Sequence, residues 1–104
     1  MQKEHLLSTR LKKARIRAGF TQKELGIRIG MEPSSASGRM NHYEKGRHMP
    51  DVGTVRRLSK ELGVPIAYFF CEDDLSAELI CLIDKLSEKD KKDLIALLSQ
   101  PNSK

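Results

Sequence analysis

Six residues between positions 34 and 42 carry side chains that form hydrogen bonds. They are Ser34, Ser35, Ser37, Arg39, Asn41 and His42. Arginine bonds bidentately to guanine and asparagine to adenine in the DNA major groove, while serine and histidine reach bases or phosphates. A helix that gives so little of its surface to a core is typical of one that touches a partner, although a solvated face is the simpler alternative. The pattern predicts a base-reading helix, with Arg39 on guanine and Asn41 on adenine.

The residues just before this segment predict a short helix. Thr21 and Glu24 have the spacing of a capping box, in which each side chain accepts from the other's backbone N–H. Leu25 and Ile29 are four residues apart and give the following helix one apolar face. We therefore expect a helix over residues 22–29.

A turn and a second helix are expected next. Gly26 permits close approach of another helix, and Gly30 allows the positive φ of a helix C-terminus. A proline followed by two serines then gives an N-terminal signal. The second helix is expected over roughly residues 35–44, with Met40 and Tyr43 facing inward.

Three motifs, taken in this order, resemble the Cro/repressor (XRE) helix-turn-helix family. They are Arg15-Ile16-Arg17-Ala18-Gly19-Phe20-Thr21-Gln22-Lys23-Glu24-Leu25, then Tyr43-Glu44-Lys45-Gly46 with Pro50, then Leu58-x-x-x-Leu62-Gly63-Val64. The resemblance covers roughly residues 7–70. It implies an all-α fold, a five-helix lambda-repressor-like domain that binds double-stranded DNA, here followed by a C-terminal helical extension.

The same resemblance implies roles for residues outside the polar helix. Relatives use the glutamine that matches Gln22, at the first turn of a helix, on the DNA backbone, where free N–H groups favour a phosphate. Further phosphate candidates, for which solubilising charge is the alternative, are Lys23, Lys45, Arg47 and His48. Arg15 and Glu44 match positions that pair in some relatives, which implies a structural ion pair that orients the reading helix.

One feature departs from the family pattern. Eighteen positions separate Leu25 from Tyr43, about one helical turn more than the family pattern has. The surplus lies around residues 32–38. Either the reading helix is longer or the turn before it is enlarged, and this decides which side chains face the groove.

Charge is distributed unevenly along the 104 residues. Residues 1–70 hold fourteen Lys and Arg against six Asp and Glu, a net charge of +8, whereas residues 71–104 hold five against eight, or −3. A basic N-terminal block that carries the polar helix suits a phosphate-binding surface. The acidic tail is expected to point away from DNA.

Catalytic, metal and membrane functions find little support. The histidines, His5 included, lack metal-ligand spacing with Cys71 and Cys81, and no nucleophile elbow, P-loop or paired-carboxylate pattern occurs. No apolar run approaches the ~20 residues that span a membrane. We expect no enzyme, no metal and no cofactor, and two reduced cysteines suit the cytoplasm.

Three further helices complete the expected domain, residues 1–70. One runs from Leu6 or Ser8 to Ala18, one from Asp51 as cap to Leu62, and a short fifth helix covers residues 66–70. Apolar residues at helical spacing place one face of each against a common core.

Residues 75–99 are expected to form two helices and a dimerisation element. The first has Ser76 as its cap and runs to Leu86, and the second begins after Ser87. Their apolar stripes are Leu75, Leu79, Leu82, Ile83 and Leu86, then Leu94, Ile95, Leu97 and Leu98. Helices this short are marginal alone, so the stripes need a partner, either this chain's own domain or a second copy.

These features predict a sequence-specific transcriptional regulator, a repressor that binds a pseudo-palindromic operator as a homodimer. The alternative is a protein-interaction module, an antitoxin or antirepressor adaptor, whose tail binds another protein. An RNA-binding domain is a weaker alternative because no aromatic stacking platform is present.

Overall fold

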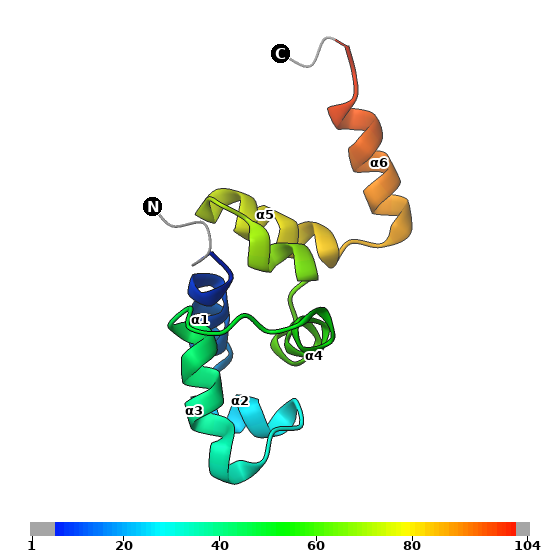
Figure 1. Cartoon of the computed structure of the whole chain (residues 1–104). Coiled ribbons are helices and arrows are strands. Elements are labelled where there is room, and N and C mark those ends of the chain that lie inside the picture. Colours follow the sequence, from blue (N-terminus) through cyan, green and yellow to red (C-terminus); the bar gives the residue numbers. More distant parts are fainter. Residues whose placement is uncertain (1–5, 102–104) are drawn as a thin grey trace.

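The computed structural model describes residues 6–101, and within that range every regular element is a helix. In chain order the elements are α1 (Leu6–Ala18), α2 (Gln22–Arg28), α3 (Pro33–Glu44), α4 (Val52–Leu62), the 3₁₀ helix η2 (Ile66–Phe70), α5 (Asp74–Asp84) and α6 (Glu88–Leu98) (Figure 1). The predicted all-α class is confirmed. Residues 1–5 of the expected domain, with His5, lie outside the described range. Among the described helices, none is long and apolar enough to cross a membrane.

The capping box that starts α2 is present as predicted. The Thr21 hydroxyl accepts from the Glu24 N–H at 3.0 Å, and the Glu24 carboxylate accepts from the Thr21 N–H at 2.8 Å. After α2, Gly30 adopts a φ of +100°, a conformation that side chains with a Cβ rarely take. The chain therefore reverses within four residues and enters α3.

Helix α3 begins at Pro33, two residues before the expected start. Proline has no N–H to leave unpaired and its fixed φ suits the first helical position, which explains the earlier start. The turn from Ile29 to Glu32 is short, so the surplus residues lengthen α3 to 12 residues and do not enlarge the turn. Glu32 is the N-cap residue but makes no side-chain cap.

Helices α2 and α3 pack closely because Gly26 has no side chain. A Cβ built on Gly26 would lie 2.8 Å from the Ala36 Cβ and 3.0 Å from the Met31 Sδ. Real Cβ atoms do not tolerate such contacts, so this glycine fixes how near α3 comes to α2.

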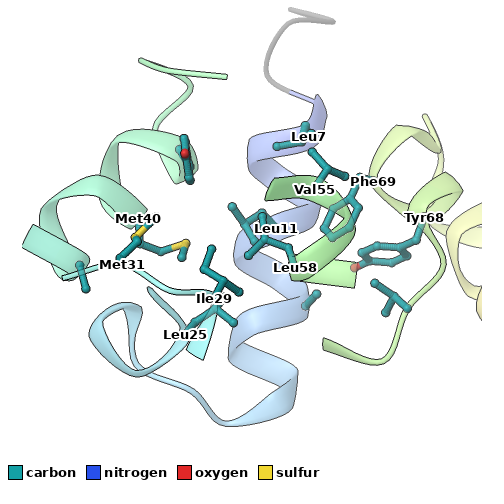
Figure 2. Close-up of a cluster of buried hydrophobic side chains, with 14 of the residues drawn as sticks. Leu7, Leu11, Leu25, Ile29, Met31, Met40, Val55, Leu58, Tyr68 and Phe69 are labelled. Carbon is teal, nitrogen blue, oxygen red and sulfur yellow. The ribbon is translucent and has the colours of Figure 1, made fainter. Parts of the chain in front are cut away.

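A single apolar core joins these helices to the rest of the domain. Leu11 of α1 is fully buried. Side chains of α2, α3 and the turn between them lie to one side of it, and side chains of α4 and η2 lie to the other (Figure 2). The expected inward residues Met40 and Tyr43 are buried, whereas Ala18, the last residue of α1, is exposed.

Helix α4 and the fifth helix close the core. Asp51 caps α4 by accepting from the Thr54 N–H at 2.8 Å, and this bond holds the Asp51 pKa below its ordinary value. The fifth helix covers the expected residues as a 3₁₀ helix. Its Tyr68 and Phe69 are buried, while Phe70 is exposed.

Helix α5 begins earlier than predicted, because the predicted cap was wrong. Asp73, not Ser76, is the N-cap residue, and its carboxylate accepts from the Ser76 N–H at 2.9 Å. An aspartate in extended backbone just before the helix competes better for the free N–H groups than a serine already inside its first turn. The helix also ends at Asp84, before the expected Leu86.

An ion pair and a second apolar face hold α5 against the domain. The Arg10 side chain is 5% exposed and donates to the Asp74 carboxylate at 2.8 Å and to the Cys71 carbonyl at 3.0 Å. Lys13 also contacts Asp74, at 3.1 Å. Hydrogen bonds from Arg10 and Lys13 hold the pKa of Asp74 below its ordinary value. On the same side Ala77 is buried in the core, a contact that the predicted leucine stripe did not include.

The predicted apolar stripes of α5 and α6 are largely exposed. The side chains more than half exposed are Leu75, Leu79, Leu82, Ile95, Leu97 and Leu98. No residue of α6 is buried, and this helix projects from the body at the end far from the α2–α3 turn (Figure 1). The radius of gyration is accordingly 16.0 Å, against ~13 Å for a compact chain of this length.

Gly26→Ala is expected to lower the free energy of unfolding by about 1–3 kcal/mol, the usual cost of an added methyl in tight packing. Gly38→Ala is the matched control, because a Cβ there meets no atom within 4 Å. The control should stabilise the chain by about 0.5–1 kcal/mol through helix propensity. Urea denaturation of both variants measures the difference. Equal stabilisation of both would show that α2 and α3 do not need the glycine contact.

Candidate nucleic-acid interface

Helix α3 presents one continuous outer face to solvent. Its buried side chains are Ala36, Met40 and Tyr43. Because successive helix residues are about 100° apart, the opposite face is fixed by their positions. That outer face is centred on Gly38 and Lys45, with Ser34 and Asn41 on one side and His42 on the other, and Ser37 lies at its edge on the Asn41 side. Asn41 and His42 are half-buried and the others are exposed.

Arg39 lies on a different part of α3 from Asn41. The two residues are separated by about 200° around the helix axis, so their side chains leave the helix in nearly opposite directions. Ser35 and His42 share the Arg39 flank, and the His42 ring lies 4.9 Å from that of His48 in the following loop. The six predicted reading residues therefore divide into an outer set and a flanking set.

A hydrogen-bonded network ties the outer face to the start of α2. The Gln22 Nε2 donates to the Asn41 Oδ1 at 3.2 Å and to the Glu44 Oε1 at 3.1 Å. The Asn41 amide nitrogen and the second lone pair of its oxygen remain available, the two groups that a bidentate contact to adenine uses. Gln22 thus orients Asn41 from a neighbouring helix.

Glu44 is also bound by Arg15, so the predicted partners are in contact. The Arg15 Nε and Nη2 donate to the two Glu44 carboxylate oxygens at 2.5 and 3.1 Å. The Arg15 Nη1 donates to the Phe20 carbonyl at 2.9 Å. Side-chain exposures are 13% for Arg15 and 3% for Glu44, so the pair is shielded from water. It joins the end of α1 to the end of α3.

Exposed basic residues surround α3. Lys23 lies in the first turn of α2, Lys45 and Arg47 follow α3, and Arg39 lies on its flank. No carboxylate lies on the outer face of α3, since Glu44 is turned inward and paired. These four basic residues outnumber the two exposed carboxylates nearby, Glu24 and Glu32, so the surface around the outer face favours anions.

His42 contains an unusual buried atom. Its Nδ1 is buried and has no hydrogen-bond partner within the described structure. A hydroxyl or water at the flank would satisfy it. No group of three or more side chains able to hold a metal ion occurs within residues 6–101.

Some of this arrangement was accessible to sequence reasoning and some was missed. The structure brings Arg15, Gln22, Asn41 and Glu44 together, and it separates Arg39 from them. Gly38 was not singled out, although it lies on the outer face. Counting around the helix from the inward Met40 would have placed Gly38 there, and it would also have separated Arg39 from Asn41.

The chain is similar to known proteins in sequence and in overall structure. A family model described as helix-turn-helix matches residues 11–69. The chain is 28% identical over 98 residues to the cryptic phage CTXphi transcriptional repressor RstR of Vibrio cholerae, covering 89% of this chain and 85% of RstR. It is 33% identical over 70 residues to the HTH-type transcriptional regulator ImmR of Bacillus subtilis (strain 168), covering 67% of this chain and about half (52%) of ImmR. The crystal structure of the transcriptional regulator BswR superposes with a TM-score of 0.81 and 48% identity, over 89% of this chain and 92% of that chain.

Glu44→Gln is expected to lower the free energy of unfolding by roughly 2–4 kcal/mol, because the Arg15 charge stays shielded without its partner. The matched control is Glu61→Gln, which breaks the more exposed contact between Arg28 and Glu61 at 3.3 Å. Exposed pairs are worth about 0–1 kcal/mol, so the control should change little. Denaturation by urea at neutral pH measures both. Equal, small losses would mean that the buried pair contributes no more than a surface contact.

Proposed function

Because the chain belongs to the Cro/repressor helix-turn-helix family, we propose that this DNA-binding transcriptional regulator is a repressor that binds a pseudo-palindromic operator as a homodimer. The family match over residues 11–69 confirms the resemblance that the sequence motifs predicted. The observation that carries the proposal is the outer face of α3, polar and free of carboxylates, with Asn41 oriented by Gln22 from the start of α2.

The division of α3 into two sets suggests a division of roles. Asn41, with Ser34 and Ser37 on the same face, is proposed to contact base edges in the major groove. Arg39, His42 and Ser35 lie on the flank, where the walls of a groove and their phosphates would be, so they are proposed to contact the backbone. Gln22, Lys23, Lys45 and Arg47 are proposed as further phosphate contacts, with Gln22 at the N-terminus of α2.

Two copies are proposed to act together through α5 and α6. Leu75, Leu79 and Leu82 repeat at spacings of four and three along α5, opposite the face that holds Ala77. An exposed stripe with this spacing suits packing against an identical helix. A two-fold dimer places its reading helices in successive major grooves ~34–36 Å apart. Repression would follow from occlusion of the polymerase at the operator.

The cellular compartment is proposed from the location of the DNA that a transcriptional regulator must bind. The named curated relatives come from bacteria, whose DNA lies in the cytoplasm. We therefore propose that the protein acts in the cytoplasm and needs no cofactor. Its DNA binding would be regulated by its abundance or by a partner protein.

Selection of bound duplexes from a random library, at moderate salt and with competitor DNA, is expected to return a two-fold motif with half-sites one turn apart. On that operator, Asn41→Ala should weaken binding by roughly 1–3 kcal/mol and relax preference at one base pair. Arg39→Ala, the matched variant, should weaken binding to operator and to random duplex equally. Equal losses for Asn41→Ala on both duplexes would remove Asn41 from base reading. No enriched motif, with binding that collapses as salt rises, would leave only phosphate attraction.

Leu79→Glu is expected to give a folded monomer, because dimerisation would bury the new carboxylate, without a partner of opposite charge, in the proposed two-fold interface. Glu78→Gln on the same helix is the control and should leave the assembly unchanged. Sedimentation equilibrium measures the mass, and binding to a full operator should weaken in parallel with dimer loss. A wild-type chain that sediments as a monomer, with the tail still exposed, would favour the alternative that the tail binds a different protein.

A further inference from the structure

Gly38 occupies a costly position for a glycine. It is the sixth of the 12 residues of α3, so it belongs to the interior of a regular helix. Glycine is the poorest helix former after proline, because it loses the most backbone freedom when the helix forms. A glycine in such a place costs the helix about 1 kcal/mol relative to alanine, a cost that a packing contact or a special backbone conformation can offset.

The chain's own structure supplies neither reason. Gly38 is not among the glycines that adopt a positive φ, so its backbone does not exclude other residues. A Cβ built on it meets no atom within 4 Å, in contrast to Gly26, where a Cβ would overlap with Ala36. Alanine would fit at position 38 and would favour the helix.

The location of Gly38 indicates what the missing side chain serves. It lies in the middle of the outer face of α3, with Ser34 one turn before it and Asn41 just under one turn after it. Its neighbour on this face, Ser37, has one of the smallest polar side chains. The surface of α3 is therefore lowest at Gly38, while the longer side chains of Arg39 and Lys45 lie to the side and at the end.

We infer that Gly38 is the point at which the backbone of α3 comes closest to the DNA, in the floor of the major groove, and that the absence of a Cβ there sets the depth of the helix. If position 38 faced a base pair that the helix does not contact closely, alanine would fit there as well as glycine and would destabilise the helix less. A partner surface that excludes even a methyl group would favour glycine over alanine. This positioning role rests on the DNA-binding function proposed above.

The depth of α3 determines what the longer side chains reach. If the helix enters the groove until its backbone meets base edges at Gly38, Asn41 stands within reach of the next base pairs along the groove. A methyl group at position 38 would lift the helix away from the bases and lengthen the Asn41 contacts. The effect on affinity is therefore expected to be greater on the operator than on random duplex.

Gly38→Ala and Gly38→Leu test the inference on the operator recovered by selection. Gly38→Ala should raise the Tm by about 4 °C, through helix propensity. It should weaken operator binding on the order of tenfold, the cost of forcing one extra methyl into a packed contact. Gly38→Leu should weaken operator binding further while the chain stays folded. Gly53→Ala in the first turn of α4, where a Cβ meets only ordinary contacts, is the control for added helix propensity and should not weaken operator binding.

The outcomes separate this inference from the proposed function. Operator binding by Gly38→Ala equal to or tighter than wild type would overturn the role of Gly38 and leave the DNA-reading proposal in place. Loss on random duplex equal to that on the operator would also overturn it, because depth in the groove acts on base contacts. A wild-type chain that binds no duplex would overturn both. A more stable Gly38→Ala variant with selectively weaker operator binding is the expected result.

Discussion

The Glu44 carboxylate accepts hydrogen bonds from Arg15 of α1 and from Gln22 of α2, while its own backbone belongs to α3. Three helices thus meet at two oxygen atoms that are shielded from water. A charge in such a place is costly to leave unpaired, so the helices cannot slide or rotate separately without breaking the pair. The apolar core brings α2 and α3 together, but apolar contacts are not directional. The orientation of the outer face of α3 therefore depends on this network, and Asn41 is aligned through the same Gln22.

Local signals in the sequence were sufficient for the elements that depend on neighbours along the chain. Thr21 with Glu24, and Asp51 before α4, were recognised as caps because both partners lie within one turn. The pair of Arg15 and Glu44 came from family resemblance, since no spacing rule joins residues 29 positions apart. The expected cap Ser76 was wrong because two residues close together, Asp73 and Ser76, had the right chemistry, and only the path of the backbone separated them.

Contacts between distant segments account for the rest of what could not be predicted. The leucine stripe of α5 was recognised by its period, whereas the opposite face was overlooked, although Ala77, Ile80 and Cys81 also follow helical spacing. It becomes a packing face because η2 lies beside it. Likewise, whether the surplus near position 35 enlarged the turn or the helix depended on how closely α3 approaches α2. That distance follows from Gly26 and Ala36 together.

The attachment of α5 to the domain has a consequence for how such chains diversify. A buried arginine, the carbonyl of Cys71, a carboxylate in the first helical turn, the buried Ala77 and the half-buried Ile80 and Cys81 make the main contacts between the two parts. Few positions of the tail thus need to be kept for it to dock. Recombination that exchanges everything after η2 for another helix pair would preserve the docking if an acid and these three apolar residues stood at the same offsets. Chains with different oligomeric states could then evolve by exchange of the tail, while the DNA-binding domain stays the same.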